Sequence, residues 1–340
     1  MITKFLKNLG RNSRYRSRVE SERLAFENVN VQDLPPILHH WSNKYLVPIL
    51  APLGFTDVIQ CFREYMARAC RSMPDETAQF LSVGAGTCAS EINIAEWLRE
   101  NSIANYCFTC LDINPNLLKK AKASAREKDL AAHFKFETFD INSWKLHRTY
   151  QAIVAFQSLH HFVELEVLFD KVHQALRPAG YFLSDDMIGR NGHQRWPEAL
   201  KFINELWREL PDKYKYNHGM KQIEKKFQNW DHSVAGFEGI RAQDILPLLT
   251  RRFNFDLFVG FGNLIDPFID RAYGPNFDPA SEWDRAFIDR VQALDESELA
   301  SGRIKPTHMI AAMTKQPVPA TKMHRNLSPK FCVRRPRRWI

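Results

Sequence analysis

The sequence predicts an α/β fold, in which a mostly parallel β-sheet is covered by helices on both faces. From Gln79 onward, short apolar segments alternate with segments of helical periodicity, and this alternation is typical of a parallel sheet. The first apolar segment runs directly into the turn Gly84-Ala85-Gly86, and the second ends on Asp112. A strand end, a glycine turn, a helix start and a carboxylate together predict a pocket for a nucleotide-type ligand.

Seven strands are expected, each a short apolar run bounded by polar or turn-forming residues. They span residues 80–83, 106–111, 134–138, 150–156, 181–184, 255–259 and 307–313. Helices are expected between them, near 89–100, after Asn114-Pro115, over 163–176 and over 241–253. Residues 190–240 are polar, aromatic and helical in pattern, with no strand, and predict a helical lid inserted between strands five and six.

The remaining boundaries follow from composition. Residues 24–77 predict an N-terminal helical cap, with one helix opening at Asp33-Leu34-Pro35-Pro36 and a second over about 56–72. One α/β domain is expected over 78–321. The 340 residues carry a net charge of +8, of which 1–23 hold +5 and 322–340 hold +7, leaving the body at −4. We therefore expect two basic, solvated tails and find little support for a nucleic-acid partner.

The compartment and redox state are predicted from what the sequence contains. No run approaches the roughly 18 uninterrupted apolar residues of a membrane span, and the charged N-terminus does not resemble a signal peptide. We therefore expect a cytoplasmic protein. Six cysteines are scattered without framework spacing, which predicts buried free thiols, and we predict no metal ligands. The oligomeric state is left open.

The glycine turn alone does not identify its ligand. Residues 84–89 satisfy the G-x-G-x-x-G/A pattern of dinucleotide folds, so NAD remains an alternative. The spacing from Gly84 to Asp112 is 28 residues, which is longer than the roughly 20 of the dinucleotide unit. This spacing counts modestly against NAD.

Three further features narrow the choice. Asp140 lies just past the third strand, the segment 156–162 (Phe-Gln-Ser-Leu-His-His-Phe) follows the fourth, and Arg177-Pro178-Ala179-Gly180 turns into the fifth. With these features the chain resembles the class I S-adenosylmethionine-dependent methyltransferases over about residues 79–186 and the closing strands. The resemblance implies a Rossmann-like seven-stranded sheet whose last strand runs antiparallel between strands five and six. It also implies S-adenosyl-L-methionine as cofactor.

The resemblance assigns cofactor-binding roles residue by residue. Gly84 and Gly86 match the glycines that let the methionine part of the cofactor pass the first strand. Asp112 matches the acid that holds both ribose hydroxyls, and Asp140 matches the acid near the adenine amino group. The cofactor-lining positions are completed by Ile141 against the adenine ring and by Phe156 and Gln157 near the sulfonium.

Two positions depart from the family pattern. The family often has an acid at the position of Ser82 and a third glycine at the position of Cys88. A methyltransferase-like binding protein without catalysis therefore remains a second alternative.

Catalytic candidates follow strands four and five, at the sheet edge where open α/β folds bind ligands. The segment 185–196 holds two carboxylates, two guanidiniums, an imidazole and an indole. His193 is our first candidate for a general base, because its ordinary pKa lies near neutral. Asp186 is the second, as a group that orients a histidine or holds a substrate hydroxyl, and His160 is the third.

The sequence thus predicts a methyltransferase that acts on O or N of a small-molecule acceptor. The alternative of an NAD-linked oxidoreductase rests on the glycine pattern alone. A nucleic-acid methyltransferase is disfavoured, because no Asn/Asp-Pro-Pro-Tyr/Phe motif follows strand four, where amino-methylating nucleic-acid enzymes keep one.

Overall fold

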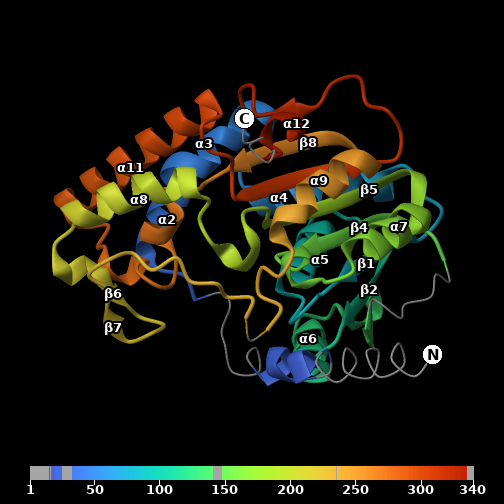
Figure 1. The fold of residues 1–340 in the computed structure, drawn as a ribbon. Helices are drawn as coiled ribbons and strands as arrows, with labels where there is room; N and C mark the ends of the chain where they lie inside the picture. The colour runs from blue at the N-terminus through green and yellow to red at the C-terminus, as the bar shows by residue number, and fades with distance from the viewer. Residues whose placement is uncertain (1–14, 16, 25–32, 141–147, 235, 335–340) are drawn as a thin grey trace, which may run out of the picture.

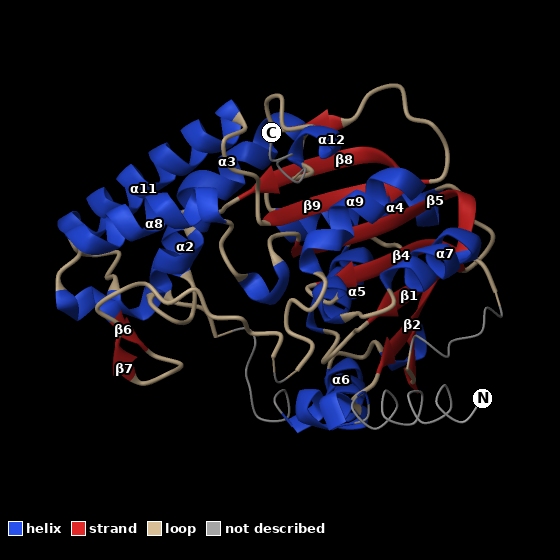
Figure 2. Cartoon of the chain, viewed as in Figure 1, coloured by secondary structure: helices blue, strands red, loops and turns tan. Residues whose placement is uncertain are grey.

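The computed structural model describes residues 15, 17–24, 33–140, 148–234 and 236–334, and its central feature is a twisted sheet (Figures 1 and 2). The order of the strands is β10-β8-β9-β5-β4-β1-β2-β3, and β9 alone runs antiparallel to its neighbours β5 and β8. The strands are β1 (Ala78–Val83), β2 (Tyr106–Asp112), β3 (Phe134–Thr138), β4 (Tyr150–Phe156), β5 (Leu176–Met187), β8 (Asn254–Phe261), β9 (His308–Thr314) and β10 (Lys322–Met323). The predicted α/β class and the antiparallel strand between strands five and six are confirmed. The sheet has eight strands rather than seven, because β10 adds to the edge of β8.

Helices cover both faces of this sheet, because alternate strand residues point to opposite sides. On one face, Phe80 and Ala152 pack in a cluster with α4 (Val58–Arg71), α5 (Ala89–Glu100) and α6 (Pro115–Glu127). On the other face, their neighbours Leu81 and Ile153 pack with α7 (Leu165–Ala175), α9 (Ala242–Arg252) and α12 (Pro329–Cys332). The strands are therefore buried on both sides, and a ligand can reach them at their ends.

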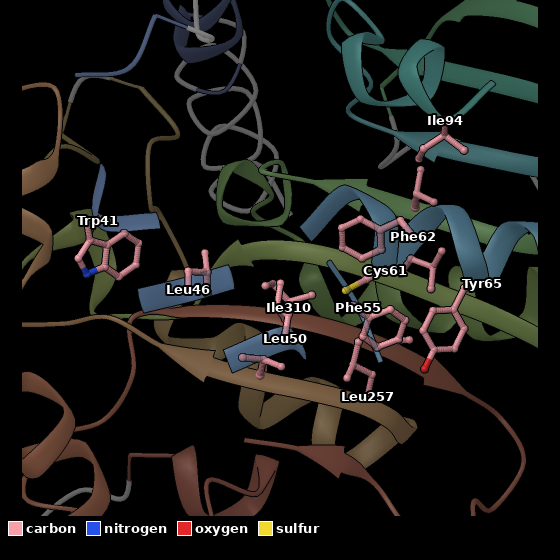
Figure 3. Close-up of a cluster of buried hydrophobic side chains, with 14 of the residues drawn as sticks. Trp41, Leu46, Leu50, Phe55, Cys61, Phe62, Tyr65, Ile94, Leu257 and Ile310 are labelled. Atoms are coloured by element: carbon pink, nitrogen blue, oxygen red, sulfur yellow. The ribbon is translucent and has the colours of Figure 1, made fainter. Parts of the chain in front are cut away.

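The N-terminal helices divide between two parts of the molecule. Helix α4 packs on the sheet, where Tyr65 Oη donates to Asp256 Oδ2 at 2.5 Å. The preceding short helical segments lead from this face toward a separate helical layer, and Figure 3 shows their apolar side chains meeting Leu257 and Ile310 of the sheet. These segments are α2 (Pro36–Trp41), η1 (Ser42–Leu46), α3 (Val47–Leu50) and η2 (Ala51–Leu53). The residues predicted as one cap thus serve both the sheet and the helical layer.

By length and composition, the stretch Pro36–Arg71 could cross a membrane, with a mean hydropathy of 1.4 in its most apolar window. The chain turns at Gly54, whose φ of 92° ends η2, and Asp57 then caps α4 by accepting a hydrogen bond from Gln60 N. The apolar residues on the inner side of both halves, such as Leu50 and Phe62, are buried in the core. Packing in the core accounts for these buried residues, and 28% of the most apolar window is buried in this way.

A layer of helices lies beside the sheet. It consists of the N-terminal helix α2 and of helices from two later segments of the chain. Along the sequence, helix α8 (Pro197–Glu209) comes between β5 and β8, and α11 (Glu282–Ser301) comes between β8 and β9. They run side by side in Figure 1, and an ion pair of 2.6 Å joins Arg290 to Glu209. Trp41 Nε1 donates to Gln292 Oε1 at 2.6 Å, which fixes α2 to α11. The smaller elements of the layer are β6 (Tyr216–Asn217), β7 (Gln222–Ile223), α10 (Asp266–Ile269), η7 (Asp212–Lys215) and η8 (Gly274–Asn276).

The lid contains other secondary-structure elements than the sequence predicted. The described part of residues 190–240, which leaves out residue 235, contains a single α-helix, a two-stranded hairpin of β6 and β7, and a long irregular return. The prediction that this segment holds no strand was wrong, because the pairing residues are too few to give a periodic pattern.

Both predicted tails also differ from expectation where the structure describes them. Residues 17–24 are helical, and Arg23 Nε donates to Ile113 O at 3.0 Å. At the other end, Leu327 and Cys332 are buried against the sheet, and Arg334 stacks on Trp196 with the guanidinium 3.9 Å from the ring centroid. The basic composition of these segments did not indicate such contacts, because arginine and lysine can pack their aliphatic stems against the protein while their charges stay exposed.

Candidate active site

A cavity of about 1130 Å³ opens at the edge of the sheet where β1, β2, β4 and β5 end. The helical layer and the helical residues 17–24 contribute the opposite wall, through Leu38, Trp41 and Glu22 among others. Nearly all the predicted site residues line this cavity. They are Gly84, Gly86, Asp112, Asp140, Phe156, Gln157, His160 and His193. Asp186 lies behind its wall, and Ile141 falls outside the described residues.

The turn after β1 has the backbone conformation that its glycines permit. Gly84 and Gly86 have φ of 69° and 54°, in the left-handed region that favours glycine. A Cβ on Gly84 would lie 2.7 Å from Cβ of Ser158, whereas a Cβ on Gly86 would meet nothing within 4 Å. The first glycine therefore allows packing against the β4 turn, and the second faces open space. Cys88, at the position of the family's third glycine, is also left-handed, with φ of 54°.

Asp112 is fixed at the end of β2 by two backbone hydrogen bonds. Its Oδ2 accepts from Gly86 N and its Oδ1 accepts from Asn114 N, both at 2.8 Å. Burial raises the pKa of this carboxyl, and the two N–H donors oppose the rise. The carboxylate thus ties the glycine turn to the start of α6 and keeps acceptor capacity beside the cavity.

The N-terminal segment covers the cavity beside Asp140. Tyr15 Oη donates to Asp140 Oδ2 at 3.0 Å, and the Tyr15 ring lies 5.6 Å from that of Phe237. Sequence reasoning assigned Asp140 but missed Tyr15, because nothing in the sequence indicates that a residue 125 positions earlier folds back onto it.

An acid also lies below the turn, although Ser82 replaces the usual one in β1. Ser82 Oγ donates to Glu91 Oε1 at 2.6 Å, and both side chains are buried. Burial raises the pKa of Glu91 to about 7. Glu91 comes from the first turn of α5 and lines the cavity. Its signal in the sequence is an acid on the otherwise apolar face of a helix that follows the glycine turn.

On the other side of the glycine turn, Asp186 organises the loop after β4. Its Oδ2 accepts from the backbone N–H groups of Ser158 (2.9 Å) and Leu159 (2.7 Å), and its Oδ1 lies 2.6 Å from His160 Nδ1. The side chain is fully buried. Of the two roles predicted for Asp186, this geometry fits the orientation of a histidine, since its oxygens point into the loop.

Glu238 is the largest omission of the sequence analysis. Its Oε1 lies 2.6 Å from His193 Nε2 and 3.5 Å from His160 Nε2, and its Oε2 lies 3.7 Å from His161 Nε2. Three histidines from two loops therefore meet one carboxylate from a third. We call His160, His161, His193 and Glu238 the histidine cluster.

The pKa values within the cluster diverge. Burial acts to lower the pKa of His160, but the charge of Asp186 and the hydrogen bonds to Asp186 and Glu238 outweigh it and raise the pKa to about 10. Burial lowers the pKa of His193 to about 4, assisted by the charge of His160 and opposed by the hydrogen bond to Glu238. Two neighbouring histidines therefore differ in charge at neutral pH, with His193 the neutral one.

The two arginines of the segment 185–196 are engaged in the protein. Arg195 Nη1 lies 2.6 Å from Asp266 Oδ2, and both side chains are largely buried. Arg190 lies over the ring of Trp196 at 5.4 Å and donates to the Arg195 carbonyl at 3.2 Å. These contacts hold the loop that carries His193 against the helical layer.

Comparison with known proteins agrees with this geometry. The model of a family described as a methyltransferase domain matches residues 74–250, which is just over half of the chain. The chain therefore belongs to this family, which confirms the resemblance to methyltransferases and decides against an NAD-linked oxidoreductase. No curated protein matches the sequence.

Solved structures share the general fold at low similarity. Geranyl diphosphate C-methyltransferase from Streptomyces coelicolor A3(2) is 13% identical with a TM-score of 0.40, over 74% of this chain and 76% of that one. The N-methyltransferase NodS from Bradyrhizobium japonicum WM9 is 12% identical with a TM-score of 0.34, over 51% and 74%. The [4+2]-cyclase SpnF is 16% identical with a TM-score of 0.40, over 75% and 81%. Values this low identify neither an acceptor nor a reacting atom.

Proposed function

We propose that this protein transfers a methyl group from S-adenosyl-L-methionine to an oxygen or nitrogen of a small-molecule acceptor. The observation that carries the proposal is that a single cavity joins the glycine turn and Asp112 to the histidine cluster. One end has the groups that suit a nucleoside, and the other has groups that can accept a proton.

The residues at the first end suit this cofactor. The Asp112 carboxylate keeps lone pairs beyond the two N–H groups it binds, and such a carboxylate suits a vicinal diol. Gly86 leaves open space where any side chain would project, so a ligand can approach the backbone there. Asp140, which already accepts one hydrogen bond from Tyr15, offers an acceptor for an amino group.

When bound, the cofactor supplies a methyl group that its sulfonium has already activated. The protein must then align the acceptor and, for an alcohol, take up a proton. Phe156 and Gln157 line the same cavity as the glycine turn and the histidine cluster, and there they can help to exclude water from the methyl group. Gln157 adopts φ of 48°, and its N–H donates to Asp185 O at 2.7 Å, which holds this segment in place.

His193 is our candidate for the proton acceptor, with Glu238 holding its Nε2 and leaving Nδ1 as the basic nitrogen. Asp186 acts as a positioning residue, because it holds His160, which in turn lies beside Glu238. An alcohol requires this proton transfer more than an amine does, and the cluster therefore fits an oxygen acceptor better than a nitrogen one.

The cavity also favours a small acceptor. Residues of the helical layer and the Arg190–Arg195 loop enclose the side that faces the histidine cluster. A cavity of about 1130 Å³ is slightly larger than the roughly 300–1,000 Å³ of most small-molecule sites, and this volume suits a cofactor together with a small acceptor.

Isothermal titration with S-adenosylhomocysteine tests the cofactor assignment. We expect saturable binding to the wild type, a loss of about tenfold or more for Asp112→Ala because a buried charge-assisted contact is removed, and no binding of NADH. Asp75→Ala, which changes an exposed aspartate outside the cavity, is the matched control. Equal affinity of the wild type and Asp112→Ala would refute the assignment. Binding without turnover across a panel of alcohol and amine acceptors would favour the non-catalytic alternative.

A further inference from the structure

The histidine cluster has a geometry that proton transfer alone does not require. Nε2 of His160, His161 and His193 all face the two oxygens of Glu238, at 3.5, 3.7 and 2.6 Å. One ligand atom from each of His160, His193 and Glu238 lies within 4.8 Å of the others. Ligands of a first-row divalent ion lie about 2 Å from it, so they are at most about 4 Å apart. Small side-chain movements would bring this set to that spacing.

The outer nitrogens of two of these histidines lie beside carboxylates. His160 Nδ1 lies 2.6 Å from Asp186 Oδ1, and His161 Nδ1 lies 2.5 Å from Glu22 Oε1. A carboxylate on the far nitrogen fixes the ring and its tautomer so that the other nitrogen is free to donate its lone pair, and this pairing accompanies most metal-binding histidines. The hydrogen bond to Asp186 fixes Nδ1 of His160, and in both rings the nitrogen directed at Glu238 is Nε2.

The backbone holds the three loops of the cluster together. Gly192 N donates to Gly239 O at 2.8 Å, and Ile240 N donates to His160 O at 3.1 Å. His193 itself has φ of 55°, an uncommon conformation for a residue with a side chain. A Cβ on Gly239 would lie 3.0 Å from the His193 ring, so glycine is needed for the approach of the two loops. Strained backbone of this kind is concentrated at functional sites.

The charges of the cluster also suit a cation. Asp186, Glu22 and Glu238 bring three carboxylates to within contact of the histidines, and Asp186 has no exposed surface. Among the described residues, the ion pairs of these three carboxylates all have a histidine as the partner. A divalent ion would balance this negative charge, and because only neutral histidines coordinate a metal, its binding would release the extra proton that His160 carries in the ion-free protein.

We propose that Nε2 of His160, His161 and His193, together with the Glu238 carboxylate, binds a divalent first-row transition ion of the kind that prefers imidazole, such as Zn²⁺ or Fe²⁺. The nitrogen-rich set selects these ions over Mg²⁺, which prefers oxygen. The His193–Glu238 hydrogen bond opens to admit the ion, and the proton of His193 moves from Nε2 to Nδ1 through solvent, so the ring stays neutral and Nε2 presents its lone pair to the ion.

Such an ion would extend the proposed function of the same cavity. An acceptor hydroxyl that binds a divalent ion loses its proton more readily, so the ion lowers the demand for a strong base. His193 then holds the ion, and its role as direct proton acceptor is confined to the ion-free protein. Ion binding itself does not depend on methyl transfer, and it is measured without cofactor or acceptor.

The experiment uses the full chain after dialysis against a chelator. Zn²⁺ is titrated calorimetrically, and Co²⁺ is titrated by its visible absorption, whose intensity reports low coordination number. We expect one ion per chain, competition between Zn²⁺ and Co²⁺, and much weaker binding of Mg²⁺. Absence of saturable binding of both Zn²⁺ and Co²⁺ would overturn the proposal.

Variants distinguish the residues that would bind the ion from the residue that holds a ligand in place. Glu238→Gln and His193→Ala should weaken Zn²⁺ binding by more than the roughly ten- to hundred-fold that loss of an outer partner costs, and Asp186→Asn should fall within that range. His218→Asn changes a histidine outside the cluster, where its Nε2 contacts Asn276, and should bind Zn²⁺ like the wild type.

Unfolding of a variant is the main alternative explanation for a loss of Zn²⁺ binding. The Glu238 side chain is 36% exposed, so its replacement by glutamine should preserve the fold, and circular dichroism with S-adenosylhomocysteine affinity checks this. Folded Glu238→Gln that binds Zn²⁺ as tightly as the wild type would contradict the assignment. Failure of cofactor binding in the wild type would instead count against the proposed function and leave the ion site standing.

Discussion

Ser82 Oγ lies 2.6 Å from Glu91 Oε1, so a helix supplies the acid beneath the glycine turn while the strand supplies its hydrogen-bond donor. Glu91 is fully buried, and burial raises its pKa from 4.5 to about 7. The carboxyl is therefore protonated in the folded protein at pH values where it is ionised in the unfolded chain.

This difference predicts a dependence of stability on pH. The folded state binds more protons than the unfolded state between about pH 4.5 and 7, so this group lowers the free energy of unfolding as pH rises through that window, by at most about 1.4 kcal/mol per pH unit. Chemical denaturation at several pH values should show a flatter profile for Glu91→Gln. Glu100→Gln, which changes an exposed glutamate of the same helix, should keep the wild-type slope. A steeper fall in Glu91→Gln would contradict the assignment.

Alanine at the two glycines of the turn should separate packing from cofactor access. Gly84→Ala places a methyl group 2.7 Å from Cβ of Ser158 and should lower the free energy of unfolding by roughly 1–3 kcal/mol. Gly86→Ala meets no atom within 4 Å and should cost only the roughly 1 kcal/mol of a left-handed alanine. Its methyl group enters the open space instead, so affinity for S-adenosylhomocysteine should fall more than stability does. Calorimetry and urea denaturation measure the two quantities, and the reverse pattern would be inconsistent with this structure.

Removal of residues 1–24 should weaken cofactor binding. Tyr15 and Arg23 make hydrogen bonds to Asp140 and to the Ile113 carbonyl beside the cofactor end of the cavity. Two hydrogen bonds at about 1 kcal/mol each correspond to roughly tenfold or more in affinity. Calorimetric titration with S-adenosylhomocysteine is the measurement. Removal of residues 1–14 alone is the control and should leave the affinity unchanged, and equal affinities of both truncations would rule out this role.

Asp266 should be a stability residue rather than a substrate contact. It pairs with Arg195 and accepts from Thr307 Oγ1, both at 2.6 Å, and the charges of His308 and Arg195 lower its pKa well below the ordinary value despite burial. Asp266→Asn leaves the Arg195 guanidinium without its partner and should cost about 3–5 kcal/mol. Urea denaturation should show the double variant Asp266→Asn/Arg195→Met losing less than the two single losses combined. Additive losses would argue against coupling.

The C-terminal residues should contribute to stability as well. Removal of 322–340 takes away β10 and exposes the surface that Leu327 and Cys332 cover, at roughly 1.5–3 kcal/mol for a fully buried side chain of this kind. Thermal unfolding should therefore occur at a lower temperature. Removal of 335–340 alone should leave it near the wild-type value, and a similar loss in both truncations would show that the described contacts are not the cause.

The sequence predicted features that depend on local pattern. The seven longer strands were found because each is a short apolar run next to a turn, and Gly84, Gly86 and Asp112 were found because a strand end fixes their position relative to a ligand. The two-residue strand β10 has too few residues to produce such a pattern.

The sequence did not predict features that depend on distant segments meeting. Glu22 and Glu238 both reach His161 from positions more than 200 residues apart, and neither lies in a segment with a distinctive composition. His160 and His193 were chosen one at a time as proton carriers, and no metal ligands were predicted, because the carboxylate between them is supplied by the return from the lid.

The position of β9 governs when this protein can assemble during synthesis. β9 (His308–Thr314) lies between β5 and β8, so those two strands cannot be joined until residue 314 has been made. Before that point, a nascent chain presents two unpaired strand edges with apolar faces, which is the condition under which chains associate wrongly. Thr307 and His308 also line the cavity, so the binding site is completed in the same late step. Ribosome-bound chains that stop before β9 should accordingly depend on chaperones far more than chains that include it.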